Sequence, residues 1–437
     1  MSRDTEMTHP QWIHFIDTVK AEVLPALGCT EPVSVGLAAA IARQKLNAIP
    51  HSIQAQVSPN LMKNGMGVKV PGTGMNGLAI AAAVGAFGGD ADAGLEVFHM
   101  LTPVHVMQAK ALIDIGKVKV SVATTTRVLF AQVTVFAHGK SVRVTIADDH
   151  THVVSIEEDG ITTFLNQPTD TPSETATAVK LPQHTTVHDI YQFITQVPVA
   201  EIAFIEQAKV LNEALSIEGL TANYGLQVGA TLQRHVDRGL ISGGLLTDVI
   251  SRSAAASDAR MGGAMLPAMS NSGSGNQGIA ATMPVVVAAE YLKASHEQLL
   301  RALMLSHLLA IYIKHHQHKL SALCAVTTAA MGSAAGITYL LGGSYQQISY
   351  AVSSMIGDVA GVICDGAKNA CAMKVSSSAG AAMKSSLMAI DNICVTGEEG
   401  IVANDVDSSI RNLSALANGA MTHTDQQILD IMVQKAL

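Results

Sequence analysis

The chain contains 437 residues, of which only 14 % are charged, and its formal net charge is −8. A chain of this length has room for two or three domains with large cores, and its acidic balance excludes a basic surface for binding nucleic acid. Its five cysteines show no short-range pairing pattern. We therefore expect a reducing, cytoplasmic environment, in which cysteines are metal ligands, catalysts or core residues rather than disulfides.

Two long uncharged segments and a mean hydropathy of +0.30 raise the question of a membrane. Residues 262–289 and 321–357 contain no Asp, Glu, Lys or Arg, but they consist largely of Ala, Gly, Ser, Thr and Met. A membrane span is typically a block of about 20 residues rich in Leu, Ile, Val and Phe. The N-terminal segment MSRDTEMTHP also lacks the apolar region of a signal peptide. We therefore predict helices buried in a large core, and no membrane partner.

Residues 1–165 mix helical and strand patterns. Helical spacing of apolar residues predicts helices over residues 8–27 and 33–46, and we expect the segment 1–48 to pack on a catalytic domain farther along the chain. Residues 50–165 combine two further helices with period-two segments joined by hairpin-type turns, which predicts an α+β domain with a mostly antiparallel sheet. The helices are expected over residues 77–87 and 104–115, and the strands in SIQAQVS, GVKV, VKVSVATTT, VLFAQVTVFA, KSVRVTIAD and THVVSIEED.

The second half of the chain has a different character. Residues 162–186 are rich in Thr and Pro, and we place a linker at residues 166–186. From residue 187 to 437, helical spacing continues with Gly-containing breaks and no convincing strand, and Asp189 stands where a capped helix start would need it. The predicted fold class is therefore α+β, with a large all-helical catalytic domain over residues 187–437 and a smaller α+β domain.

One glycine-rich turn has the spacing of a dinucleotide-binding fingerprint. Gly72, Gly74 and Gly77 form G-x-G-x-x-G between a strand-like stretch and an Ala-rich helix, and Asp90 follows at a suitable distance. Pro71 at the strand end and the lack of subsequent βαβ units argue against a nicotinamide oxidoreductase. The alternatives are a tight turn into a buried helix, or a turn whose N–H groups hold an anionic substrate group.

Three cysteines stand at predicted ends of elements. Cys29 lies in LGCTEP between two helices, Cys324 opens a small-residue helix, and Cys364 precedes a helix-breaking Asp-Gly pair. Their wide separation excludes a zinc finger or a ferredoxin-type run, but not a site assembled in three dimensions. For Cys371 and Cys394 packing is the first interpretation. Cys371 is also a reserve ligand, because it would lie near Cys364 on a continuing helix.

Two polar segments invite functional interpretations. Residues 270–278, SNSGSGNQG, offer hydroxyls, amides and backbone N–H groups at the start of an apolar helix, which suits a carboxylate; the alternative is a polar interdomain loop. The loop lacks the ending of a nucleotide-binding P-loop. In KHHQHK, adjacent histidines point in different directions on a helix and have no nearby carboxylate, so we interpret His315, His316 and His318 as a solvated helix end rather than a metal site.

Three lysines stand out because their surroundings are otherwise Gly, Ala, Asn and Met. They are Lys63, Lys368 and Lys374. A lysine in such a context is paired with a carboxylate, has a lowered pKa suited to proton transfer, or extends along a helix edge to water.

Five ordered motifs resemble the L-cysteine desulfidase family, which is related to the α-chain of iron–sulfur L-serine dehydratases. They are LGCTEPVSVGLA, LMKNGMGVKVPGTG, SGSGNQGIAATMPV, LCAVTTAAMGSAAGI and GDVAGVICDGAKNACAMKV. The resemblance extends from Cys29 almost to the C-terminus. It implies an oxygen-sensitive [4Fe–4S] cluster held by Cys29, Cys324 and Cys364, with the fourth iron left open.

The sequence departs from the serine dehydratase pattern at one point. Those enzymes take a third ligand from a cysteine shortly after the second cysteine of the helical domain, and Cys371 is closer than that pattern expects. The turn at Cys29 matches the desulfidase pattern instead, which favours L-cysteine over L-serine as the substrate.

The resemblance implies β-elimination of hydrogen sulfide from L-cysteine, with pyruvate and ammonia as the other products. We expect Lys63 first, and Lys368 second, to move the proton. The substrate carboxylate would be bound by Gly72, Gly74, Ser272, Ser274 and Asn276. No motif indicates pyridoxal phosphate.

Two other functions remain open at this point. The first is an iron–sulfur L-serine dehydratase, and the second is an amino-acid-binding protein that keeps the fold without a cluster. The low charge of the long helices also suggests a homodimer.

Overall fold

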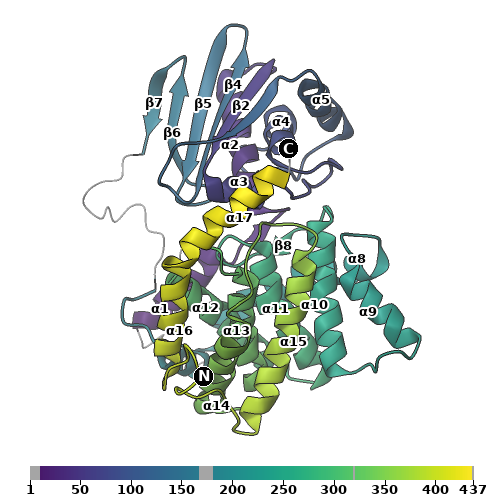
Figure 1. Cartoon of the computed structure of the whole chain (residues 1–437), viewed down its shortest axis with the longest axis vertical. Helices are drawn as coiled ribbons and strands as arrows, with labels where there is room; N and C mark the ends of the chain where they lie inside the picture. The colour runs from purple at the N-terminus through teal and green to yellow at the C-terminus, as the bar shows by residue number, and fades with distance from the viewer. Residues whose placement is uncertain (1–9, 167–180, 318–319, 436–437) are drawn as a thin grey trace, which may run out of the picture.

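The computed structural model of the protein describes residues 10–166, 181–317 and 320–435. It has a smaller α+β domain and a larger helical domain, with the C-terminal helix lying across both (Figure 1). The predicted α+β fold class is confirmed. Within the described residues, no helix is long and apolar enough to cross a membrane.

The smaller domain is built on a six-stranded sheet with the order β3-β2-β4-β5-β6-β7. Only β2 and β3 are parallel, and every other neighbouring pair is antiparallel, as the period-two segments predict. The strands are β2 (Ser52–Val57), β3 (Val118–Val122), β4 (Phe130–Ala137), β5 (Lys140–Ala147), β6 (Val153–Glu158) and β7 (Ile161–Leu165). Strand β7 occupies the start of the Thr-rich segment that resembles a linker. The rest of the expected linker, residues 167–180, lies outside the described residues.

Three helices of the smaller domain cover the buried face of the sheet. They are α2 (Thr30–Leu46), α4 (Leu78–Gly88) and α5 (Pro103–Asp114). In β2 the side chains of Ile53, Ala55 and Val57 point to this face, and they share one hydrophobic core with α2 and α4. Glycine permits the close approach of α2 and α4, because a Cβ atom at Gly85 would lie 2.3 Å from the carbonyl oxygen of Gly36.

The position of α2 differs from the sequence prediction for residues 1–48. Helix α1 (Pro10–Glu22) packs in the core of the helical domain, as expected, whereas α2 belongs to the smaller domain. The reason lies in its surface: almost every α2 residue from Thr30 to Ala42 is buried, and its Ala and Gly residues fit closely against α4 and the sheet. Helical spacing shows which side chains are apolar, but not which domain covers them.

The helical domain surrounds two central helices, α11 (Gly275–Tyr291) and α13 (Ala325–Leu340), in which Glu290 near the end of α11 is the one charged residue. Their neighbours are α10 (Leu245–Met261), α12 (His296–His315) and α15 (Cys371–Ile390). The outer helices are α6 (Val187–Gln196), α7 (Val199–Ile202), α8 (Glu206–Thr221), α9 (Val228–Asp237), α14 (Tyr345–Val359) and α16 (Val406–Asn418). The predicted capped start of α6 is confirmed, since Thr186 and Asp189 form a reciprocal capping box. The uncharged segments are thus buried in protein.

Two connections join the domains beside the site described below. The short strands β1 (Pro25–Ala26) and β8 (Ala268–Met269) pair antiparallel, so the second half of the chain contains one short strand where none was predicted. Helix α17 (Met421–Lys435) leaves the helical domain and packs on α3 (Pro59–Gly65) of the smaller domain (Figure 1). The first connection holds the turn before Cys29 against the segment before the SNSGSGNQG loop.

Candidate functional site

Four of the five cysteines line a single buried cavity between the domains. They are Cys29, Cys324, Cys364 and Cys371. Cys29 and Cys324 are the N-cap residues of α2 and α13, and Cys371 is the first residue of α15. Neither N-cap cysteine makes a side-chain capping bond, so both thiols are available to the cavity. The structure thus brings the three predicted ligands and the reserve ligand together, and their role as ligands stays a prediction.

The positions of the thiols at helix N-termini have an electrostatic consequence. The unpaired N–H groups of a first helical turn carry partial positive charge, which stabilises a thiolate or another anion nearby. Helix α11 also begins at this cavity, through Ser274 and Asn276. Four helix N-termini therefore converge on one small volume, an arrangement suited to holding several negative charges.

The backbone fixes Cys324 and Cys364 relative to each other. The N–H of Cys324 donates to Val362 O at 3.0 Å, and the N–H of Cys364 donates to Ala322 O at 2.6 Å. Between these bonds, Leu323 and Ile363 form an isolated antiparallel bridge. Residues 362–370 then run as a non-helical loop to Cys371, so Cys371 approaches Cys364 through this loop and not, as expected, along a continuing helix.

Burial governs the protonation of these thiols. It raises the pKa of Cys29 to about 11 against the opposing charge of Arg260, with Glu31 adding to the increase. It raises the pKa of Cys371 to about 12, and the charge of Cys364 adds to the shift. Cys29 and Cys371 are therefore protonated at neutral pH, and binding of a metal to either thiol would release its proton. Cys394 lies outside the cavity, in the loop after α15.

The donor set is compatible with a cluster rather than a single ion. Among the described residues, no three His, Cys, Asp or Glu side chains stand close enough to hold one metal ion. A cubane cluster is wider than one ion and takes its thiolate ligands at different corners, so its ligands need not converge on a point. Thiolates are also the ligands that iron–sulfur clusters use.

The SNSGSGNQG loop forms another wall of the cavity. Ser272, Ser274 and Asn276 line it, as predicted for a substrate-binding loop, and their role in binding stays a prediction. Ser272 adopts a left-handed conformation with φ 49°, which turns the chain into α11. The loop is neither exposed nor loosely packed, because all three of these side chains are buried or nearly so.

A buried hydrogen-bond network stabilises the SNSGSGNQG loop. The Asn271 amide accepts from Ser272 Oγ at 2.9 Å and donates to Nδ1 of His307 at 3.1 Å. On the other side of the ring, His307 Nε2 lies 2.9 Å from Thr282 Oγ1, and the Thr282 hydroxyl donates to Gly278 O. His307 is therefore a neutral imidazole that carries its proton on Nε2. Burial lowers its pKa to about 3.

This neutral histidine predicts a pH-dependent term in stability. An unfolded chain binds a proton at His307 below pH 6.5, whereas the folded chain excludes it down to about pH 3, so folding stability is lost as the pH falls through this window. We expect His307→Gln to be less stable than wild type at pH 7, and the deficit to shrink by about 2 kcal/mol at pH 5. Urea unfolding at both pH values measures the change. A deficit that does not vary with pH would show that the folded protein protonates His307.

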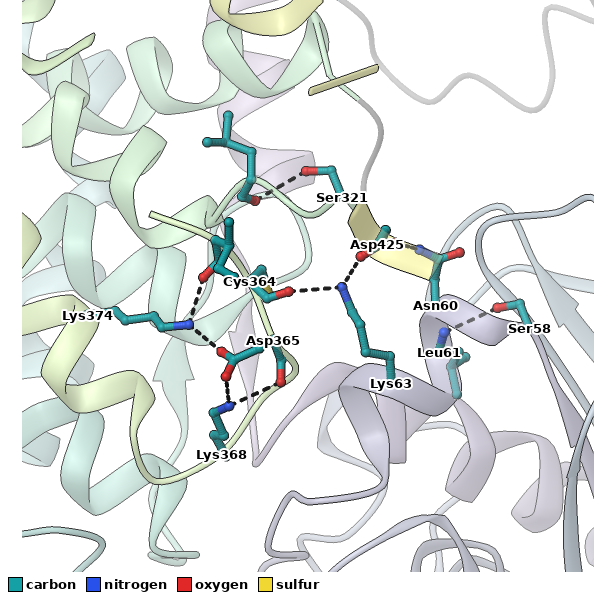
Figure 2. Close-up of polar contacts among 12 residues, drawn as sticks. Ser58, Asn60, Leu61, Lys63, Ser321, Cys364, Asp365, Lys368, Lys374 and Asp425 are labelled. Carbon is teal, nitrogen blue, oxygen red and sulfur yellow. Dashed lines mark hydrogen bonds and ion pairs between the residues drawn. The ribbon is translucent and has the colours of Figure 1, made fainter. Parts of the chain in front are cut away.

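The predicted catalytic lysines do not face the cavity. Lys63 is 1 % exposed, pairs with Asp425 of α17 and donates to the carbonyl oxygen of Cys364 at 3.2 Å (Figure 2). Lys368 pairs with the side chain of Asp365 and bonds its carbonyl oxygen, and Lys374 pairs with the same carboxylate. These pairs hold the pKa of Asp365 at about 2, although its partial burial acts in the opposite direction.

The lysine contacts correct the sequence prediction. Of the alternatives for these lysines, the structure supports pairing, because each ammonium contacts a carboxylate outside the cavity (Figure 2). A paired ammonium cannot accept a proton until it has lost one. The spacing of lysines in the sequence could not show this, since Asp425 is distant in the chain from Lys63.

Gly72 and Gly74 are also separated from the cysteines. They line a different, open pocket together with Lys110 and Asp114 of α5 and with Met265. Both have positive φ, 72° and 71°, which accounts for glycine in a tight turn. The structure therefore supports the tight-turn interpretation, and neither glycine lines the cavity that contains the SNSGSGNQG loop.

The described part of the histidine-rich segment KHHQHK, at the end of helix α12, is less exposed to solvent than the sequence predicts. His316 stacks edge-on against the Tyr312 ring at 4.9 Å, and His318 lies outside the described residues. The neighbouring Lys314 is only 4 % exposed and lines the cysteine cavity. The interpretation of a solvated helix end is therefore wrong for Lys314.

Several cavity residues were missed by the sequence analysis. Their side chains, which line the same cavity, are Glu31, Asn64, His150, Arg260, Gln277 and Lys314. Two of these residues have sequence features that could have identified them as candidates. Glu31 stands in the same CTEP turn as Cys29, and Arg260 is the charged residue at the edge of the uncharged segment 262–289. A charge beside a long apolar segment has to be buried with it or paired.

Known proteins resemble this chain over most of its length. A family model described as the serine dehydratase alpha chain matches residues 92–430. The chain belongs to the serine dehydratase alpha chain family. It is 66 % identical to a UPF0597 protein of Photobacterium profundum over 97 % of this chain and 99 % of that one. It is 60 % identical to a UPF0597 protein of Shewanella pealeana, with the same coverage, and 54 % identical to the UPF0597 protein YhaM of Escherichia coli over 98 % of each chain.

Membership of the serine dehydratase alpha chain family fits the architecture described above. The match covers α5 and strands β3 to β7 of the smaller domain and almost the entire helical domain, including Cys324, Cys364 and Cys371. The relatives match along nearly their entire lengths, so the matches include both domains. The protein is thus a serine-dehydratase-like member of a lyase-related family.

Proposed function

We propose that the protein is an L-cysteine desulfidase that uses a [4Fe–4S] cluster held by Cys29, Cys324 and Cys364. The reaction is a β-elimination: the Cα proton and the thiol leave as hydrogen sulfide, and the aminoacrylate that remains hydrolyses to pyruvate and ammonia. The observation that supports this most is that four cysteines and the SNSGSGNQG loop line one cavity.

The residues present fit such a cluster. Cys29 and Cys324 are buried at helix N-termini, which favour thiolates, and Cys364 is half-buried in the loop before α15. The three cysteines come from both domains. When bound, a cluster with three thiolate ligands offers one iron with an exchangeable position, which acts as a Lewis acid toward the substrate. Cys371 is the alternative third ligand, because it lines the same cavity as Cys364.

The chain's own residues bind and orient the substrate in this proposal. Ser274 and Asn276 at the start of α11 present a positive helix end to the substrate carboxylate, and the Ser272 hydroxyl lies beside them. Ser272 and Asn276 are themselves buried, and the limited access of water to their polar groups strengthens these interactions. We do not assign the proton transfer to Lys63 or Lys368, because neither lines the cavity.

A second candidate function, L-serine dehydratase activity, is favoured by the family match itself. The two reactions differ only in the group that leaves the β-carbon. The preference for L-cysteine rests on the turn at Cys29, whose LGCTEP sequence resembles the desulfidases.

The test uses protein purified without oxygen. We expect about four irons and four labile sulfides per chain, sulfide release from L-cysteine, and much slower pyruvate formation from L-serine. Both substrates are assayed on the same preparation, and iron is determined before and after. A cluster with fast turnover of serine and none of cysteine would replace the proposal with the dehydratase. Absence of iron after anaerobic reconstitution would contradict both and leave a binding protein.

A further inference from the structure

Two buried side chains of opposite charge line the cysteine cavity without forming an ion pair with each other. Arg260 at the end of α10 is 4 % exposed, and Glu31 in the first turn of α2 is 8 % exposed. Burying a charge without a partner is costly, so such residues are uncommon in a protein interior. Their retention at the wall of a cavity points to a charged ligand.

The guanidinium of Arg260 has hydrogen-bond capacity to spare. Its Nη2 donates to Gly28 O at 2.8 Å and its Nη1 approaches Met261 Sδ at 3.3 Å, whereas its Nε has no partner within the described part of the chain. A guanidinium has five N–H donors; bonds to Gly28 O, Met261 Sδ and the Cys29 thiol engage three of them, so two donors, one of them the Nε–H, remain for a ligand. Arg260 also lies against Gly275, where a Cβ atom would stand 2.1 Å from Nε. The guanidinium and the start of α11 therefore face the same space.

Glu31 stands on the neighbouring wall. Its carboxylate accepts a hydrogen bond from Thr30 Oγ1 at 3.3 Å, and among the described residues it forms no ion pair. Glu31 follows Cys29 by two residues, and the Arg260 guanidinium donates to the carbonyl oxygen of Gly28, the residue before Cys29. The two groups thus lie within electrostatic reach of the place where Cys29 meets the cavity.

Two further polar atoms are left unsatisfied at this cavity. They are Oδ1 of Asn64 and Oε1 of Gln277, both buried and without a hydrogen-bond partner in the described residues. Both are acceptors. An incoming group with several N–H donors, such as an ammonium, would satisfy them, whereas a second carboxylate would not.

We propose that Arg260 and Glu31 are paired anchors for a zwitterionic α-amino acid, with the guanidinium binding the α-carboxylate and the Glu31 carboxylate binding the α-ammonium. The inference rests on the proposed function for the identity of the site, and it adds the substrate class. Both charges of the ligand are then neutralised in a cavity of low dielectric, where charge-assisted bonds are strong. Amines without a carboxylate, and carboxylic acids without an amine, satisfy only one anchor.

The arrangement also orients the β-carbon. A carboxylate held between Arg260 and the start of α11, and an ammonium held at Glu31, fix two substituents of Cα. The side chain is then directed into the rest of the cavity, which the cysteines line. The site therefore selects α-amino acids with short side chains.

The test measures binding of three small probes to the anaerobic protein by calorimetry. L-alanine carries both charges, 3-mercaptopropionate carries the thiol and the carboxylate, and cysteamine carries the thiol and the ammonium. We expect Arg260→Gln to weaken the binding of 3-mercaptopropionate at least about tenfold and to leave the binding of cysteamine unchanged. We expect Glu31→Gln to weaken the binding of cysteamine and to leave that of 3-mercaptopropionate unchanged. Both variants should weaken L-alanine, and Arg260→Lys should restore part of the carboxylate binding.

In this crossed pattern, each variant loses affinity for one thiol probe and keeps its affinity for the other. The retained affinity also shows that the variant is folded. Arg252→Gln is the matched control on the same helix: Arg252 pairs with Glu213 and Glu290 away from the cavity, and its loss should change none of the three affinities. Equal weakening of every probe by both variants would overturn the proposal. So would unchanged probe binding accompanied by loss of iron in Arg260→Gln, since Arg260 would then serve the Cys29 thiolate.

The same measurements separate this inference from the proposed function. Alanine and the two thiol probes are not desulfidase substrates, so the binding pattern does not depend on sulfide release. A protein that shows the crossed pattern but releases no sulfide would be an amino-acid site with another chemistry. A protein that releases sulfide without the pattern would keep the function and contradict the anchors.

Discussion

Replacing Cys29 by alanine is expected to remove both the bound iron and the sulfide-releasing activity, while the protein remains folded. The Cys29 thiol is buried at the N-terminus of α2 and makes no capping bond there. Alanine therefore removes the thiol, which donates only a weak 3.7 Å bond to Met261 Sδ among the described residues, without disturbing the helix cap. Deleting one small buried group costs about 1 kcal/mol, which a domain of ordinary stability withstands. Iron, labile sulfide and sulfide release from L-cysteine are measured on the same anaerobic sample.

The matched control is Cys394→Ala. Cys394 lies outside the cavity, so this variant should retain wild-type iron and activity. Comparable variants of Cys364 and Cys371 then decide the third ligand. Full iron content in Cys29→Ala, combined with iron loss in Cys371→Ala, would contradict the assigned set. The ligands would then be Cys324, Cys364 and Cys371, all from the helical domain.

The cysteine positions show what the sequence does predict. Cys29, Cys324 and Cys364 each stand beside residues that break regular structure, and such breaks are local properties of the chain. The start of α13 at Cys324 and the capping box at Thr186 follow from the same local chemistry. The strands of the smaller domain were predictable for a similar reason, because period-two alternation is set by one buried face.

The predictions that were wrong depended on distant parts of the chain. An isolated lysine among small residues indicates pairing or an altered pKa, and only the approach of α17 to α3 shows that the partner of Lys63 is Asp425. The same holds for Gly72 and Gly74, whose turn has suitable N–H groups but faces α5. Arg260 and Glu31 were overlooked because the functional role of a buried charged residue depends on which other residues line the same cavity.

Breaking the Lys63–Asp425 pair is expected to have the largest effect on stability. The two side chains are 1 % and 8 % exposed, and they join the smaller domain to the C-terminal helix (Figure 2). Lys63→Met leaves the Asp425 carboxylate buried without its cation, which typically costs about 3–5 kcal/mol. Lys63 also binds the carbonyl oxygen of Cys364, so the variant should lose iron more readily on dilution into chelator. Urea unfolding and the rate of iron release measure the two effects.

A double variant distinguishes the buried charge from the packing around it. Lys63→Met combined with Asp425→Leu removes both charges, and it should recover much of the stability that either single change loses, because no unpaired charge remains. The surface pair Arg127–Asp148 provides the control: its side chains are 37 % and 61 % exposed, and Arg127→Met should cost less than about 1 kcal/mol.

The rate of iron release tests the functional part of this prediction. If the double variant regains stability yet still releases iron faster than wild type, the bond from Lys63 to the Cys364 carbonyl positions the cluster-binding loop independently of the ion pair. If stability and iron retention recover together, the pair acts only by holding α17 against α3. A Lys63→Met protein with wild-type stability and unchanged iron would contradict both roles, and would mean that the ammonium and the carboxylate are hydrated separately in solution.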